Sequence, residues 1–186
     1  AGLILPNSEV LIKNVGINPT RAGLIKVCEA MGANLTLLNE DHDNAEPTAD
    51  LLVRTSSLKG CVIEGDIIPT LIDELPTIAM MACFAEGTTV IRDAAELKVK
   101  ESNRIAIMVE NLRSMGADVE ETDDGMIIHG GKPLHGAVVD SHKDHRIAMT
   151  FAIAALAADG ETEILDADCV DISYPSFYEE LKKLTH

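Results

Sequence analysis

The sequence predicts an α/β fold built from a repeated unit, and three observations support this prediction. Residues 10–40 and residues 89–124 resemble each other, since each stretch begins with a β-rich run, continues into an amphipathic helix and ends that helix at Met-Gly-Ala. Each stretch is followed by a second, more apolar helix that also ends in glycine. Strands and helices therefore alternate at a regular spacing, which is typical of α/β domains.

The first copy is expected to contain six elements. They are a strand beginning at Val10, an amphipathic helix over residues 24–31, a strand over 35–38, two strands within 51–66 and an apolar helix over 75–87. Apolar residues three and four apart predict the first helix, and alternation of apolar and polar residues predicts the strands. The second helix is apolar nearly all round, so we expect it inside the domain.

The second copy repeats this order, and a third copy begins after it. The expected elements are a strand over 88–93, a helix over 105–115, a strand over 119–122, two strands within 126–141, an apolar helix over 145–160, a strand over 161–166 and a last helix over 175–184. We therefore expect residues 1–186 to form most of one domain, with βαβαββ repeats at about 9–87 and 88–160 and a partial repeat at 161–186.

Charge and cysteine content exclude several classes of function. The 186 residues carry 15 Lys and Arg against 31 Asp and Glu, a formal charge of −16. Such a field repels nucleic acids and acidic membrane surfaces, and the apolar stretches are shorter than the ~20 residues of a membrane helix. The four cysteines have no zinc-ligand spacing. We expect a cytoplasmic protein without metal, nucleic-acid partner or membrane partner.

The beginning of the chain predicts a fragment. Residues 1–9 are apolar but lack the basic leader and cleavage pattern of a secretory signal. They are better interpreted as the tail of a helix whose beginning is missing. An alternative is that tag removal produced the Ala1 terminus.

Three turns concentrate charged residues at the starts of helices. In a helical continuation Lys100 and Arg104 are four residues apart, about 40° around the axis, so two cations would lie beside helix N-terminal amides and could bind an anion. Arg146 follows Asp144 directly before an apolar helix and could clamp a carboxylate or phosphate. At the equivalent turn of the first copy Asp73 could act as a general base.

Each of these turns also has a purely structural interpretation. Ser102 or Asn103 could cap a solvated helix, Asp144 could cap the next helix while Arg146 pairs with an acid, and Asp73 could be a cap. If the repeat brings equivalent turns to one end of the domain, the three turns meet on one face. The functional interpretation depends on that convergence.

The motifs Lys-Val-Lys-Glu-Ser-Asn-Arg at residues 98–104 and Asp-His-Arg at 144–146, with the Ile-Asp-Glu-Leu-Pro turn at 72–76, resemble the enolpyruvyl transferase family. The likeness covers essentially the whole chain. It implies an inside-out, barrel-like α/β fold of two domains, of which this chain matches the C-terminal part. The implied reaction transfers the enolpyruvyl group of phosphoenolpyruvate to the 5-hydroxyl of shikimate 3-phosphate and needs no cofactor.

The resemblance also implies roles for six residues. Asp73 and Glu101 would be catalytic, with Asp73 at the attacking hydroxyl and Glu101 at the phosphoenolpyruvate methylene. Asp73 and Lys100 would contact shikimate 3-phosphate. The phosphoenolpyruvate anion would be held by Arg104, His145 and Arg146.

Two other functions remain open. One is a non-catalytic anion-binding module, and the other is the related transfer to UDP-N-acetylglucosamine. Because the resemblance assigns further substrate-binding residues to an N-terminal domain that this chain lacks, we expect the isolated chain to be inactive.

Overall fold

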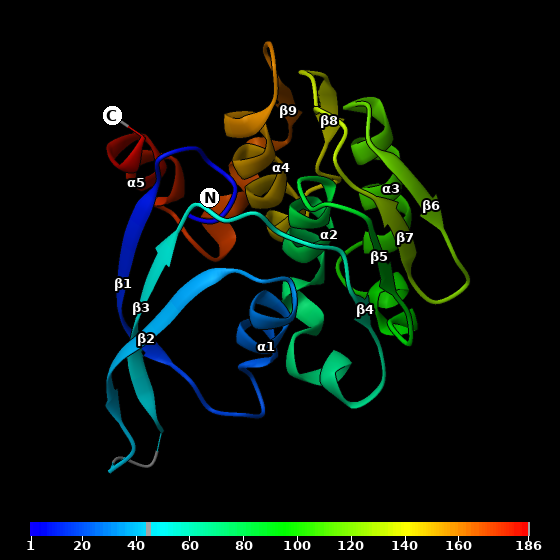
Figure 1. The fold of residues 1–186 in the computed structure, drawn as a ribbon. Coiled ribbons are helices and arrows are strands. Elements are labelled where there is room, and N and C mark those ends of the chain that lie inside the picture. Colours follow the sequence, from blue (N-terminus) through cyan, green and yellow to red (C-terminus); the bar gives the residue numbers. More distant parts are fainter. Residues whose placement is uncertain (44–45, 186) are drawn as a thin grey trace.

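A computed structural model describes residues 1–43 and 46–185 and has an α/β fold, as predicted (Figure 1). The strands are β1 (Glu9–Gly16), β2 (Asn34–Asp41), β3 (Thr48–Arg54), β4 (Val62–Ile63), β5 (Thr88–Ile91), β6 (Asp118–Glu121), β7 (Met126–His129), β8 (Val138–Asp140) and β9 (Glu163–Leu165). The α-helices are α1 (Gly23–Ala30), α2 (Leu75–Cys83), α3 (Arg104–Ser114), α4 (His145–Ala157) and α5 (Phe177–Leu184). Short 3₁₀ helices are η1 (Gly65–Thr70), η2 (Ile72–Glu74), η3 (Ala95–Val99) and η4 (Ala167–Ile172).

The described strands form three separate sheets that do not close into a barrel. The first sheet has the antiparallel order β1-β3-β2, and the second has the order β4-β5-β7-β6, in which only β4 and β5 are parallel. The third sheet consists of the parallel pair β8-β9. The order β5-β7-β6 repeats the pairing seen in β1-β3-β2, although the sequence analysis predicted no order of strands within a sheet. The repeat boundaries themselves stay a prediction.

Two glycines in equivalent loops show how closely the repeated segments pack. A Cβ on Gly60 would lie 2.3 Å from the carbonyl oxygen of Thr88, and one on Gly136 would lie 2.0 Å from that of Glu161. Each loop thus crosses directly over the first residues of the next repeat. Any larger residue at either position would push the two backbones apart.

The two apolar helices form the centre of the molecule, between the first sheet on one side and the second sheet with α3 on the other (Figure 1). Eight of the nine residues of α2 are buried, and the fully buried Phe151 lies on α4. The helices touch at the Thr77 and Thr150 hydroxyls, 3.2 Å apart. Burial of their apolar side chains stabilises the fold by about 25 cal/mol per Å². Because α2 and α4 pack together, their N-terminal turns are held close to each other.

No helix in the described part of the chain is long and apolar enough to cross a membrane.

Candidate active site

The N-terminal ends of α2, α3 and α4 meet at one place and bring charged residues from all three turns together. Asp73 lies in η2 directly before α2, Glu101 lies in the turn before α3, and Arg104 is the first residue of α3. Arg146 is the second residue of α4. The convergence on which the functional interpretation depends is therefore present in the structure.

Arg104 is the centre of this cluster, and its side chain is only 1% exposed. Its Nε donates to Asp144 Oδ2 at 2.8 Å, its Nη2 to Glu101 Oε2 at 2.6 Å, and its Nη1 to Asp73 Oδ1 at 3.3 Å. One guanidinium thus joins carboxylates from the three turns. Charge-assisted hydrogen bonds of this kind are roughly twice as strong as neutral ones.

Asp73 accepts contacts from three cations. Its Oδ1 lies 3.7 Å from Lys100 Nζ, in addition to the contact with Arg104, and its Oδ2 lies 3.5 Å from Arg146 Nη2. Arg146 Nη1 also donates to the Asp73 carbonyl oxygen at 3.2 Å and lies 3.8 Å from Glu74 Oε1. Asp73 is partly exposed, so a ligand hydroxyl can approach it.

Lys100 does not continue the helix, so the arrangement in which Lys100 and Arg104 share one helical face does not occur, and the alternative of a helix capped at Asn103 is the one present. The chain leaves η3 at Lys100 in an extended conformation, and α3 begins only at Arg104. Lys100 Nζ instead pairs with Glu96 Oε1 at 2.5 Å, and this hydrogen bond raises the pKa of the ammonium group. The two cations still come together, because both contact Asp73.

His145 is the one predicted site residue that stays outside this network. It is the first residue of α4 and is partly buried. No hydrogen bond or ion pair joins its side chain to another residue of ranges 1–43 and 46–185.

Asp144 and Ser102 belong to the cluster, although no binding or catalytic role was predicted for either. Asp144 is fully buried and caps α4, since its Oδ1 accepts from the backbone N–H groups of Arg146 and Ile147. Ser102 Oγ donates to Asp144 Oδ2 at 2.9 Å, and the neighbouring Asn103 caps α3. The sequence signalled Asp144 only as a possible cap. Its contact with Arg104, 40 residues away in sequence, had no local signal.

Burial alone would raise the pKa of Asp144. The hydrogen bonds and positive charge of Arg104, with the Ser102 hydroxyl, instead hold this pKa below its ordinary value of 3.8. Asp144 is therefore ionised at neutral pH.

The ion pairs of this cluster contain more carboxylates than cations. Lys100, Arg104 and Arg146 face five carboxylates, which belong to Asp73, Glu74, Glu96, Glu101 and Asp144. The cluster thus carries a formal charge of −2 by this count. A phosphate or carboxylate ligand must replace some of these contacts or bring in cations from elsewhere.

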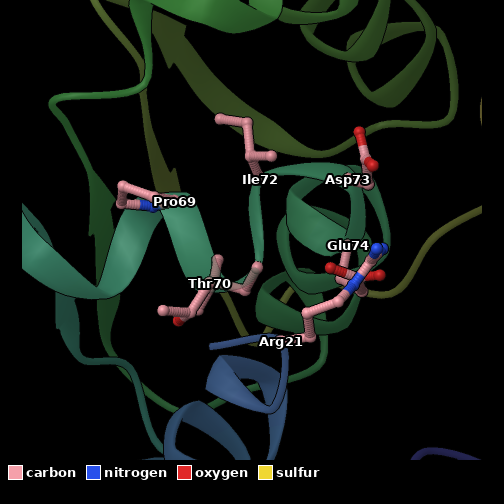
Figure 2. Close-up of a pocket in the computed structure, with 7 residues that line it drawn as sticks. Arg21, Pro69, Thr70, Ile72, Asp73 and Glu74 are labelled. Atoms are coloured by element: carbon pink, nitrogen blue, oxygen red, sulfur yellow. The ribbon is translucent and has the colours of Figure 1, made fainter. Parts of the chain in front are cut away.

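A cavity of about 230 Å³ opens beside Asp73 and Glu74 (Figure 2). Arg21, from the turn before α1, extends toward it and has no ion-pair partner among the described residues. Gly23 holds this turn close, because a Cβ there would lie 2.1 Å from Thr70 Oγ1. Arg21 and Arg104 precede the two Met-Gly-Ala triplets by 10 and 11 residues, so they have similar places in the two copies of the repeat.

Within residues 1–43 and 46–185, no group of three or more His, Cys, Asp or Glu side chains is arranged to hold a metal ion.

Comparisons with known proteins agree with the resemblance seen in the motifs. Residues 1–181 match the family model described as EPSP synthase (3-phosphoshikimate 1-carboxyvinyltransferase). A protein of that name from Synechococcus sp. (strain JA-3-3Ab) is 55% identical over 184 residues, which are 99% of this chain and 41% of the relative. One from Alkaliphilus oremlandii is 54% identical over 182 residues, 98% of this chain and 43% of the relative. The chain spans less than half the length of these relatives.

Solved structures of related proteins agree with these sequence matches. The structure of EPSP synthase from Acinetobacter baumannii matches with a TM-score of 0.94 and 42% identity, over 98% of this chain and 43% of that one. The enolpyruvyl transferase NikO from Streptomyces tendae matches with a TM-score of 0.78 over 99% of this chain and 40% of that one. At 21% identity, the likeness to NikO shows the fold alone.

Proposed function

The chain belongs to the EPSP synthase family, and on that premise we propose that it supplies one part of an active site that transfers the carboxyvinyl group of phosphoenolpyruvate to shikimate 3-phosphate. The observation that carries this proposal is the contact of Asp73 and Glu101 with one guanidinium, that of Arg104. Two carboxylates are thereby held near each other, as a reaction with two proton transfers requires.

The addition step needs a base and an acid at the same time. Asp73 takes the proton of the 5-hydroxyl as its oxygen bonds to C2 of phosphoenolpyruvate, and Glu101 gives a proton to the methylene carbon, C3. In the elimination step the bond from C2 to the phosphate oxygen breaks, Glu101 takes a proton back from C3, and Asp73 returns its proton to the leaving phosphate. Proton transfer by a positioned side chain typically contributes about 10²–10⁴-fold to a rate.

The cations of the cluster are assigned to the two substrates. Lys100 contacts shikimate 3-phosphate, while Arg104 and Arg146 hold the phosphoenolpyruvate anion with His145 beside them. Arg146 is the more accessible of the two arginines, because its side chain is partly exposed whereas that of Arg104 is buried. Binding of the anion replaces the contacts of Arg146 with Asp73 and Glu74, which leaves Asp73 available for the hydroxyl.

The remaining positive charge comes from the part of the whole protein that this chain does not include. Both substrates are polyanions, and the cluster has an excess of carboxylates. Two such ligands would be repelled unless further cations faced them. We therefore expect the isolated chain to be inactive and an N-terminal domain to complete the site.

The third sheet supports the related proposal that residues 1–186 form most of one domain. Strands β8 and β9 pair like β4 and β5, but among the described residues β9 has no neighbours equivalent to β7 and β6. An apolar cavity of about 320 Å³ also lies between the first five residues and the end of α5. Native cores leave few voids larger than a water molecule, so other segments of the whole protein are expected to pack here.

We propose a cytoplasmic location as part of the same function. The four cysteines are free thiols. Burial raises the pKa of Cys83 to about 12, so this thiol is inert as well as inaccessible.

The test uses a completed enzyme, in which residues 1–186 replace the matching 184 residues of the Synechococcus sp. (strain JA-3-3Ab) relative. Release of inorganic phosphate is measured with phosphoenolpyruvate and either shikimate 3-phosphate or UDP-N-acetylglucosamine. We expect release with shikimate 3-phosphate only, and none from the isolated chain with either acceptor. A folded completed enzyme that releases no phosphate would contradict the proposal.

A pair of arginine variants tests the anion site. Arg146→Ala in the completed enzyme is expected to raise the KM for phosphoenolpyruvate at least about tenfold, because a charged hydrogen-bonding group contributes about 1.5–3 kcal/mol. The matched control is Arg54→Ala, since Arg54 pairs with Glu9 on the first sheet, away from the cluster. If Arg146 has a purely structural role, both variants should have equal KM values for phosphoenolpyruvate.

A further inference from the structure

The hydrogen bonds of Arg104 are divided between two edges of its guanidinium. Along one edge, Nε and Nη2 donate to Asp144 Oδ2 and Oδ1 at 2.8 and 3.3 Å. Along the other, Nη2 donates to Glu101 and Nη1 to Asp73. A guanidinium has five N–H groups in a fixed plane, so the direction of the first edge determines the direction of the second.

Asp144 is well placed to fix that first edge. It is fully buried, and both of its carboxylate oxygens are bound at the same time. Oδ2 accepts from Ser102 at 2.9 Å and from Arg104, while Oδ1 accepts from Arg104 and from the backbone N–H groups of Arg146 and Ile147. The carboxylate is thus tied both to the start of α4 and to the turn that precedes α3.

We propose that Asp144 is a positioning residue of the reaction: together with Ser102 it orients Arg104, and Arg104 in turn holds Asp73 and Glu101 in place for proton transfer. This inference rests on the proposed function. Asp144 does not touch the substrates, because it is enclosed on every side.

A contribution to stability alone would not explain this arrangement. A buried ion pair adds little to stability compared with apolar residues of the same volume, because both charges lose their hydration. Its orienting effect is larger, since a misplacement of about 1 Å at reacting groups can lower a rate by about 10²-fold. The chain of contacts from Asp144 through Arg104 reaches both carboxylates that the mechanism uses.

Three variants of the completed enzyme test the proposal. Asp144→Asn keeps an oxygen that can cap α4 but replaces the acceptor for Arg104 Nε with an amide group. Ser102→Ala removes one hydrogen bond from the same carboxylate, and because this change is small we expect the variant to fold. The control is Asn103→Ala, which removes the cap of α3, a comparable local change, but leaves the Arg104 to Asp144 contact intact.

The expected result is a loss of kcat with a change in the solvent deuterium isotope effect. We expect kcat to fall about 10²-fold in Asp144→Asn and roughly threefold to tenfold in Ser102→Ala, and to stay within about twofold in Asn103→Ala. The isotope effect on kcat should become larger in the first two variants, because misplaced carboxylates make proton transfer slower. A merely structural role would reduce the amount of active enzyme and leave the isotope effect unchanged.

The proposal is overturned if folded Asp144→Asn keeps the wild-type kcat and isotope effect. If Asp144→Asn does not fold, Ser102→Ala decides the matter by the same two measurements.

A second measurement does not depend on activity. Solvent exchange of the Arg104 Nε–H, followed by ¹⁵N nuclear magnetic resonance in the completed enzyme, should be at least about tenfold faster in Asp144→Asn or Ser102→Ala than in wild type. Unchanged exchange would overturn the orienting role of Asp144. Absence of phosphate release from the unchanged completed enzyme would instead defeat the proposed function, so the two failures are distinguishable.

Discussion

Removal of the Arg104 side chain is expected to destabilise the fold far more than removal of an arginine from an ion pair at the surface. The perturbation is Arg104→Ala, and its matched control is Arg92→Ala. Arg104 Nε lies 2.8 Å from Asp144 Oδ2, and Arg92 Nε lies 2.7 Å from Glu64 Oε2. The two Nε contacts have nearly the same length, but the two pairs differ strongly in burial. Arg104 also contacts Glu101 and Asp73, whereas Glu64 is the one ion-pair partner of Arg92 among the described residues, so both differences add to the loss expected for Arg104→Ala.

The difference in burial determines the expected magnitudes. The side chains of Arg104 and Asp144 are 1% and 0% exposed, whereas those of Arg92 and Glu64 are 52% and 49% exposed. Arg104→Ala leaves a carboxylate in the interior without a cation, which costs about 3–5 kcal/mol. Arg92→Ala exposes Glu64 to water, which solvates it, and is expected to cost about 0–1 kcal/mol.

The assays are urea unfolding and thermal unfolding of the 186-residue chain, which we expect to fold alone, both followed by circular dichroism at neutral pH. At roughly 2–4 °C per kcal/mol, the melting temperature should fall by about 6–20 °C for Arg104→Ala and by less than about 4 °C for Arg92→Ala. Adding Asp144→Asn to Arg104→Ala should restore part of the loss, because the uncompensated charge is then removed while an acceptor for the cap remains. If the unfolding free energies lost in Arg104→Ala and Arg92→Ala differ by less than about 1 kcal/mol, the argument from burial is refuted.

Three further predictions concern catalysis, pH and packing. Glu101→Gln should lower kcat of the completed enzyme by about 10²–10⁴-fold, whereas Glu110→Gln, on the exposed side of α3, should leave it within about twofold of wild type; similar phosphate release from both would remove Glu101 from the mechanism. Because the pKa of Asp144 is lowered on folding, its charge stabilises the fold above its ordinary pKa of 3.8, and this contribution is lost as the pH falls below that value. The difference in unfolding free energy between wild type and Asp144→Asn should therefore shrink below pH 3.8 in acid titrations. A difference that does not change with pH would contradict the ion pair of Asp144 with Arg104. Gly125→Ala places a Cβ 1.9 Å from a carbonyl oxygen of β5 and should cost at least about 1–3 kcal/mol in urea unfolding, whereas exposed Gly16→Ala, with nothing within 4 Å, should change stability by less than about 0.5 kcal/mol; equal effects would mean that the close approach is absent.

The order of the elements was predictable because it depends on local patterns. Ile105, Met108 and Leu112, at spacings of three and four residues, give α3 its buried face. Alternation gives β7 its buried Met126 and Ile128. The caps were also visible in part, since Asn103 and Asp144 stand at positions where short polar side chains accept from free backbone N–H groups.

Local patterns left the conformation at Lys100 open. The sequence from Lys98 to Arg104 is compatible with a continuous helix, but the chain is extended at Lys100 and α3 begins at Arg104. The side chain of Ser102 then faces Asp144, and that of Arg104 faces Asp73, instead of following helical spacing along the segment. Contacts with distant residues decided the conformation here, and no window of the sequence contains those residues.

By itself, the amino-acid sequence determined the fold class, the repeated order of strands and helices, the motifs of the family and the three charged turns, because each of these depends on residues close together in the chain. Only the tertiary structure decided that Arg104 is buried, that Asp144 anchors it and that Asp73 receives three cations. The physical reason is that a charge is held inside a protein by partners of opposite charge, and the packing of α2 against α4, not their separation in sequence, brings those partners together.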